Sequence, residues 1–97
     1  MEPGKDGGAL YFFTAAWSAP GRLMEPVVKK LARDFALPYV RIDVDRDPGA
    51  VRLYGLRILP ETALVAGGTV ARRWTGYRPE IEIRRGLLDA FGAGPSP

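Results

Sequence analysis

Residues 9–22 read ALYFFTAAWSAPGR, and this stretch decides the fold. Its first seven residues, 9–15, are almost all apolar and include three aromatic side chains, which is typical of a strand buried at the centre of a sheet. A turn follows at residues 17–20. Apolar side chains then recur at helical spacing in two rows, which are Leu23, Val27 and Leu31, and Met24, Val28 and Phe35. The stretch therefore predicts a buried strand, a turn and an amphipathic helix.

The next two elements are a strand and a short helix. Residues 39–44 alternate between apolar and polar side chains, as in a strand with one buried face. Asp47 followed by Pro48 is typical of a helix start, with the aspartate as N-cap and the proline at the first helical position. Gly55 is typical of a residue that ends a helix, so the short helix is predicted to run to Tyr54.

Two strands and a helix complete the pattern. Residues 61–66 and 69–75 are joined by Gly67-Gly68, a strong hairpin signal. Pro79 opens the last helix, whose apolar stripe consists of Ile83, Leu87, Leu88 and Phe91. The order strand–helix–strand, helix, strand–strand–helix predicts an α/β domain. Its sheet is expected to be four-stranded and mixed, with helices on both faces.

The length fits one small domain. We expect residues 9–91 to form it, with residues 1–8 as a flexible arm and residues 92–97 as a flexible tail. The N-terminus is polar and lacks the apolar core of a signal peptide. No apolar run approaches the roughly 20 residues needed to cross a bilayer. The sequence therefore predicts a cytoplasmic protein with no membrane partner.

The chain contains neither cysteine nor histidine. Their absence removes thiol chemistry, histidine-activated nucleophiles and histidine-bound zinc. Asp43, Asp45 and Asp47 alternate, but the glycine and glutamate of a calcium-binding loop are missing, so we expect no metal and no cofactor. The formal net charge is +3, and the basic residues are spread along the chain rather than clustered. We therefore expect no nucleic-acid partner.

Several motifs occur in the order and spacing of one known family. Trp17 is followed by Pro20 and Arg22 at the first strand–helix junction, and Pro60 comes three residues after Arg57. The other markers are Pro26, Asp45, Asp47-Pro48-Gly49, Tyr54-Gly55-Leu56-Arg57, Gly67-Gly68 and Gly76. Over about residues 9–91 the chain resembles the thioredoxin superfamily. The resemblance implies a minimal thioredoxin fold.

Four positions depart from that family's pattern. Ser18 and Gly21 stand where the family usually has its two cysteines, and Phe12 stands where many members bury an aspartate. Glu61 replaces the threonine that is common after the family's cis-proline. Because thiol–disulfide exchange needs a thiolate, we expect no catalytic residue, and we expect Ser18 to cap the helix instead. The four changes together favour a natural loss of the thiols over an engineered replacement.

The resemblance also implies a peptide-binding groove. In this family a cis-proline beside the active-site turn exposes the preceding backbone to an extended peptide, and Pro60 matches that proline. The implied groove consists of Trp17, Ser18, Ala19, Pro20, Ile58, Leu59, Pro60, Thr75, Gly76 and Tyr77. Backbone pairing of this kind needs no sulfur.

Three functions remain open on the sequence alone. The first is a redox-inactive domain that binds a protein or peptide partner in the groove. The second is a thiol–disulfide oxidoreductase whose cysteines were replaced by mutation. The third is a structural module that forms a homodimer through the strand edge that carries Trp74. The first is favoured, because the groove markers are kept while both sulfurs are lost.

Overall fold

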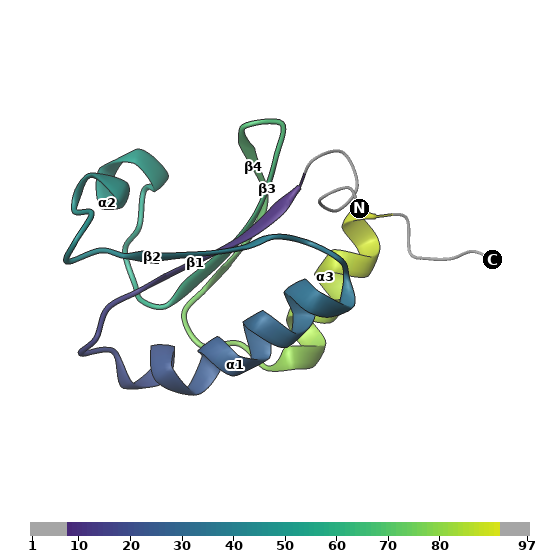
Figure 1. Cartoon of the computed structure of the whole chain (residues 1–97), viewed down its shortest axis with the longest axis horizontal. Coiled ribbons are helices and arrows are strands. Elements are labelled where there is room, and N and C mark those ends of the chain that lie inside the picture. The colour runs from purple at the N-terminus through teal and green to yellow at the C-terminus, as the bar shows by residue number, and fades with distance from the viewer. Residues whose placement is uncertain (1–7, 92–97) are drawn as a thin grey trace.

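The computed structural model describes residues 8–91 (Figure 1). The expected arm, apart from Gly8, and the expected tail lie outside the described residues. The elements in chain order are β1 (Ala9–Thr14), α1 (Ala19–Asp34), β2 (Tyr39–Asp43), α2 (Gly49–Tyr54), β3 (Glu61–Ala66), β4 (Thr69–Thr75) and α3 (Glu80–Ala90). This order confirms the predicted α/β architecture.

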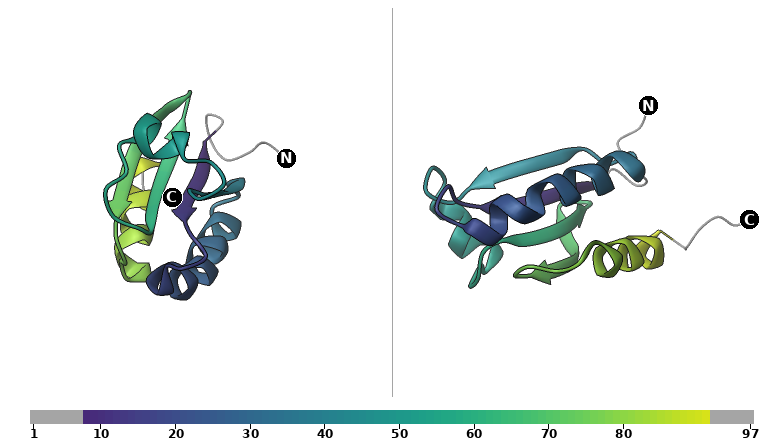
Figure 2. Two further views of the ribbon diagram at one scale, coloured as in Figure 1. Left: turned by 90° about the vertical axis from the view of Figure 1, so that its left-hand side faces the viewer. Right: turned by 90° about the horizontal axis from the view of Figure 1, so that it is seen from below.

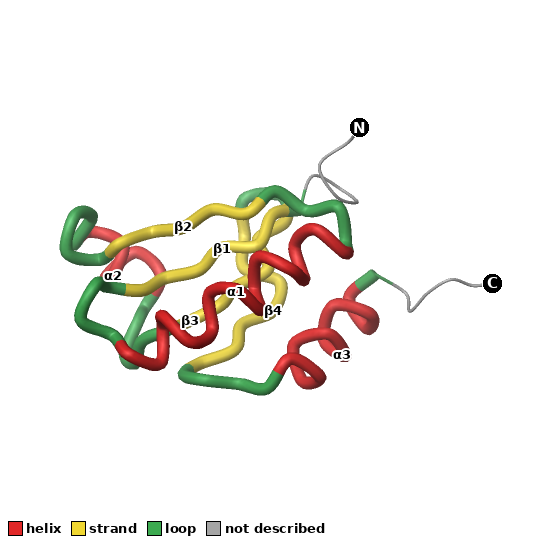
Figure 3. Tube along the Cα trace, turned by 60° about the horizontal axis from the view of Figure 1, so that its bottom comes forward, coloured by secondary structure: helices red, strands yellow, loops and turns green. Residues whose placement is uncertain are grey.

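The four strands form one mixed sheet in the order β2-β1-β3-β4. β1 runs parallel to β2 and antiparallel to β3, and β3 runs antiparallel to β4. Gly67 and Gly68 both have positive φ, at 61° and 81°, and they close the β3–β4 hairpin in a conformation that costs glycine little. Figures 2 and 3 show α1 and α3 together on one face of the sheet, and α2 lies over the other. The predicted helices on both faces are therefore confirmed.

The main core lies between the sheet and the pair α1 and α3. Phe12 of β1 is fully buried in one cluster with Met24 and Val28 of α1 and Ile83 of α3. Burying an apolar side chain of this size stabilises the fold by roughly 1.5–3 kcal/mol. The sequence prediction was wrong about Leu23, which is 71% exposed. Met24 faces the sheet. Leu23, one position earlier, is rotated by about 100° around the helix axis and therefore points to solvent.

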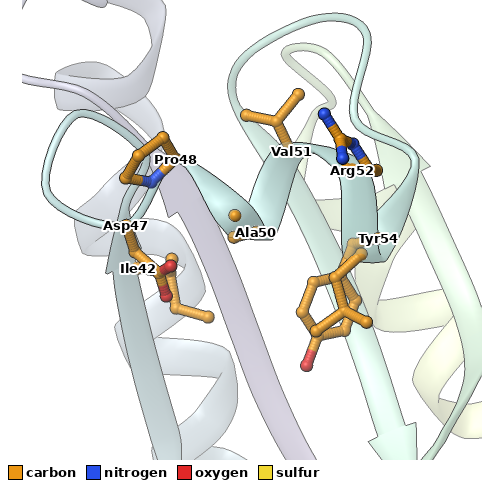
Figure 4. A pocket seen from close by; sticks show the side chains of 9 residues that line it. Ile42, Asp47, Pro48, Ala50, Val51, Arg52 and Tyr54 are labelled. Atoms are coloured by element: carbon orange, nitrogen blue, oxygen red, sulfur yellow. The ribbon is translucent and has the colours of Figure 1, made fainter.

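The opposite face of the sheet is only partly covered. A second apolar cluster around Phe13 and Ala63 lies on the side of α2. Because α2 has six residues, it shields only one end of this face. A cavity of about 1040 Å³ lies beside it, and Figure 4 shows Ile42 of β2 and Tyr54 of α2 on opposite sides of this space. This cavity is separate from the groove that the resemblance implies.

The start of α2 differs from the prediction. Asp47 makes no side-chain cap, and Pro48 is the cap residue rather than the first helical residue. Pro48 already has helical backbone angles (φ −64°, ψ −21°), and the Asp47 carbonyl accepts the Ala50 N–H over 3.0 Å. The backbone therefore closes the first turn without the carboxylate.

Trp74 of β4 packs against α3. Its side chain is half-buried and lies against the main core. A Cβ atom on Gly86 would lie 2.5 Å from Trp74 Cζ2, so the helix can approach the indole only because residue 86 has no side chain. The close fit explains a glycine inside α3. It also uses much of the indole surface that the sequence suggested as a dimer contact.

Candidate functional site

Strand register brings three separate segments together at one end of the sheet. Phe13 near the end of β1 pairs with Glu61 at the start of β3, and Glu61 pairs with Thr75 at the end of β4. The Gly76 N–H donates to the Pro60 carbonyl over 2.8 Å. The turn after β1, the segment before β3 and the segment after β4 therefore meet there.

Ser18 is the N-cap of α1, as predicted. Its backbone is extended (φ −87°, ψ 101°), and its Oγ accepts a hydrogen bond from the Gly21 N–H over 3.1 Å. The Arg22 N–H donates to the Ser18 carbonyl over 3.1 Å. The side chain is buried, and its hydroxyl satisfies a donor that the start of the helix would otherwise leave free. The first cysteine position therefore has a structural role here.

Thr14 fills the space that a side chain at position 21 would need. Gly21 is buried in the first turn of α1. A Cβ atom there would overlap Thr14 Oγ1 and would lie 3.0 Å from Ser18 Oγ. Position 21, which matches the second cysteine of the resembled family, therefore has neither a sulfur atom nor space for a side chain. Sequence reasoning missed Thr14, although a lone hydroxyl near the end of an apolar strand was a usable signal.

Trp17 lies at the surface of this end of the sheet, with 67% of its side chain exposed. Its Nε1 donates to Asp45 Oδ2 over 3.0 Å, and the Asp45 N–H donates to Asp43 Oδ1 over 2.9 Å. On the other side of the turn, Arg22 Nη1 donates to the Ala16 carbonyl over 2.7 Å. These bonds hold the turn and orient the indole while leaving most of the ring open to solvent.

Two more apolar side chains are exposed at the same end. Ile58 is 56% exposed and Tyr77 is 55% exposed. Gly76 has φ of 77°, and a Cβ atom on it would lie 3.8 Å from Ile58 Cγ2, so Ile58 lies against the end of β4. We call Trp17, Ile58 and Tyr77 the end surface. The other predicted groove residues are Ala19 and Pro20, which are exposed, Leu59, Thr75 and Gly76, which are half-buried, and Ser18 and Pro60, which are buried. The Leu59–Pro60 peptide bond is cis.

Glu61 is a buried carboxylate directly after Pro60. Its Oε2 lies 3.0 Å from Arg73 Nε, and its Oε1 accepts from Thr75 Oγ1 over 3.3 Å. Arg73 Nη2 also donates to the Tyr54 carbonyl over 2.7 Å, so one guanidinium joins β3, β4 and the end of α2. Burial raises the pKa of the Glu61 carboxyl, and the opposing effects of Arg73 and Thr75 are smaller. The sequence marked Glu61 as a departure but gave no partner for it.

Among residues 8–91, no three histidine, cysteine, aspartate or glutamate side chains are grouped so that they could hold a metal ion. Asp43 and Asp45 use oxygens to order the loop beside Trp17. The end of the sheet thus carries apolar side chains, backbone groups and arginine side chains.

Comparison with known proteins gives the family. The Thioredoxin family model matches residues 5–89. Thioredoxin 2 of Chlorobaculum tepidum is 32% identical over 89 residues, which cover 90% of this chain and 82% of that protein. Thioredoxin of Alicyclobacillus acidocaldarius is 30% identical over 88 residues, which cover 89% of this chain and 84% of that protein. The chain belongs to the thioredoxin family.

A solved structure agrees with this assignment. A single-site mutant of thioredoxin from Halobacterium salinarum NRC-1 superposes with a TM-score of 0.81 at 27% sequence identity, covering 95% of this chain and 80% of that chain. The present chain nevertheless has no cysteine anywhere in its sequence. Its own side chains therefore hold no thiol with which to exchange disulfides.

Proposed function

We propose that this chain is a redox-inactive thioredoxin-family domain that binds a polypeptide partner at the end surface and the groove residues around Pro60. The observation that carries the proposal is the exposure of Trp17, Ile58 and Tyr77 together, at the end of the sheet where the sulfur positions stand. Apolar side chains that gather on a soluble surface are typical of a contact site. Trp and Tyr contribute strongly to binding energy at such sites.

The alternative of an oxidoreductase with replaced cysteines is less well supported. Mutation of two cysteines would account for Ser18 and Gly21 only. In this chain Phe12 is also fully buried where an aspartate would be expected, and Thr14 occupies the space beside Gly21. Phe12 and Thr14 therefore fit a chain that has no sulfur at positions 18 and 21, which favours natural loss of the thiols. Cysteine codons at positions 18 and 21 of the native gene would overturn this conclusion.

The proposed partner is a polypeptide rather than a nucleic acid. Several surface cations pair with carboxylates, such as Lys30 with Glu80, at 3.0 Å, and Arg72 with Asp89, at 3.7 Å. A nucleic-acid surface instead needs a patch or stripe of free positive charge. Within residues 8–91, no helix has the length and apolar character needed to span a bilayer. A cytoplasmic location stays a prediction from the sequence.

The first test is quantitative affinity capture from native lysate with the immobilised chain and three variants. Trp17→Ala and Ile58→Ala remove parts of the end surface. Leu53→Ala is the matched control, because Leu53 is 76% exposed but lies on α2. We expect a protein retained by the unmodified chain and by Leu53→Ala to be lost with either end-surface variant, while circular dichroism shows all four chains folded.

Retention that is equal for Trp17→Ala, Ile58→Ala and the unmodified chain would show that the end surface is the wrong site. A separate assay addresses the redox part of the proposal. We expect no acceleration of insulin reduction by dithiothreitol in the presence of this chain, because it has no thiol to carry electrons. A clear rate increase would contradict that part.

A further inference from the structure

We infer that the segment held at the end surface is acidic, with aspartate or glutamate side chains on either side of an apolar centre. The inference rests on the proposed function and names the chemistry of its partner. It is carried by two arginine side chains that adjoin the end surface, Arg57 and Arg22. Both are exposed, and among residues 8–91 neither has a carboxylate oxygen within 4.0 Å.

The chain positions of these arginines place them beside the exposed apolar side chains. Arg57 directly precedes Ile58. Arg22 donates to the carbonyl of Ala16, the residue directly before Trp17. We expect a peptide that covers Trp17 and Ile58 to reach both arginines with its flanking side chains. An arginine can meet a carboxylate with two parallel hydrogen bonds, which favours Asp or Glu at those flanks.

Two acidic side chains near this end have partners of their own, and of the two only Glu82 is paired with a cation. Asp45 Oδ2 accepts from the Trp17 Nε1–H, and Glu82 pairs with Arg78 over 3.2 Å. The first turn of α1 contains no acidic residue, so nothing there offsets Arg22 or the partial positive charge of the helix start. Arg46 does not contribute to this surface, because it lies with Asp43 and Asp47 around a different cavity. The net charge of +3 acts in the same direction by attracting an acidic partner over longer distances.

The test uses three fluorescently labelled ten-residue peptides with one Val-Leu-Val centre, flanked by glutamates, by glutamines or by lysines. We expect the glutamate peptide to bind at least about fivefold more tightly than the glutamine peptide at low ionic strength, and the lysine peptide to bind most weakly. The glutamate preference should shrink at about 1 M salt, where charges are screened within a few ångströms.

Variants then assign the preference to the two arginines. Arg22→Gln and Arg57→Gln should each reduce the glutamate preference about two- to fivefold, and the double variant should abolish it. Arg85→Gln is the matched control, because Arg85 is exposed on α3 and also lacks a carboxylate within 4.0 Å in the described part of the chain. If a variant fails to fold, the salt titration of the unmodified chain still tests whether the glutamate preference is electrostatic.

The outcomes separate this inference from the function on which it rests. Equal binding of the glutamate and glutamine peptides overturns the acidic partner. A glutamate preference that survives the double variant overturns its assignment to Arg22 and Arg57. Either result leaves the polypeptide site standing. Failure of all three peptides at millimolar concentration contradicts the site and the inference together. Tighter binding of a ten-residue oligothymidine than of the glutamate peptide would replace the acidic polypeptide with a nucleic acid as the partner.

Discussion

Thr14 and Gly21 occupy one small space beneath the turn that follows β1. A side chain at position 21 would overlap the Thr14 hydroxyl, although alanine is ordinarily preferred over glycine inside a helix by about 1 kcal/mol. We therefore expect Gly21→Ala to lower the free energy of unfolding by about 1–3 kcal/mol, the usual cost of overfilling a packed interior. Urea unfolding followed by circular dichroism measures this change.

The second half of this experiment places the same substitution in a Thr14→Ala chain. The overlap is absent there, so Gly21→Ala should cost little or should stabilise the helix. Similar losses of stability in both backgrounds would show that Thr14 is not the obstacle. The result bears on function because the same overlap would oppose a cysteine at position 21.

The residue scale also shows where sequence reasoning succeeds. Ser18 was identified as an N-cap because a short hydroxyl side chain before a helix has one favoured partner, a free backbone N–H of the first turn. Thr14 was given no role, and the ion pair of Arg73 with Glu61 was not predicted. Their partners, Gly21 and Glu61, are brought to them only by packing and strand register, which no local pattern encodes.

At the scale of elements, the fit between α3 and β4 depends on Gly86. We expect Gly86→Ala to destabilise the domain by about 1 kcal/mol or more, because a new methyl group would meet the Trp74 ring at 2.5 Å. Gly49→Ala in α2 is the matched control. A Cβ atom there would meet nothing closer than Asp47 Oδ1, at 3.7 Å, so alanine should stabilise by up to about 1 kcal/mol.

Thermal unfolding of both variants beside the unmodified chain decides this point. A rise in melting temperature for Gly86→Ala would mean that the helix moves easily away from the indole. In that case Trp74 would be less firmly held in the domain, and the edge of the sheet would again be a candidate contact surface between copies.

Element order was predictable because local signals mark each boundary. Gly67-Gly68 placed the hairpin, and Gly55 placed the end of α2. The inner face of α1 was not predictable in full, because Leu23 and Met24 head equally apolar rows and the sequence does not fix the rotation of the helix about its axis. The predicted side-chain cap by Asp47 was wrong, because Pro48 already has helical backbone angles and the Asp47 carbonyl, not its carboxylate, accepts the first hydrogen bond.

At the scale of the whole molecule, Glu61 links stability to pH. Burial raises its folded-state pKa above the ordinary value of about 4.3 for an unfolded chain. Between those two values the native state binds more protons than the unfolded state, so its contribution to stability falls as the pH rises. Above the folded-state pKa the loss is complete.

Urea unfolding of the unmodified chain and of Glu61→Gln across about pH 4 to pH 8 isolates this effect, starting at the ordinary glutamate pKa. The stability of Glu61→Gln relative to the unmodified chain should increase with pH and then level off. Hydrogen bonds from Arg84 and Lys30 lower the pKa of Glu80, so its contribution to stability is lost as the pH falls. Both proteins contain Glu80, so this contribution cancels in the difference between them. Parallel curves would contradict the assignment to Glu61.

The residues of the candidate site could be predicted from the sequence, but their exposure and contacts could not. The resemblance named Trp17, Ile58 and Tyr77 from their places in a motif order. Their exposure, the support of Trp17 by Asp45, and the lack of a carboxylate beside Arg22 and Arg57 among residues 8–91 emerge only when distant segments are brought together. Those features supply the chemistry on which the acidic partner is proposed.

Register across β1, β3 and β4 has one last consequence, for turnover in the cell. Trp17 and Tyr77 are sixty positions apart along the chain by their numbers, so an unfolded copy does not hold them together as the end surface. The proposed partner, if it needs both side chains, binds folded copies, and by mass action it shifts the population toward them. An occupied domain should then outlast an empty one under protease attack, so that its abundance would follow the supply of its partner.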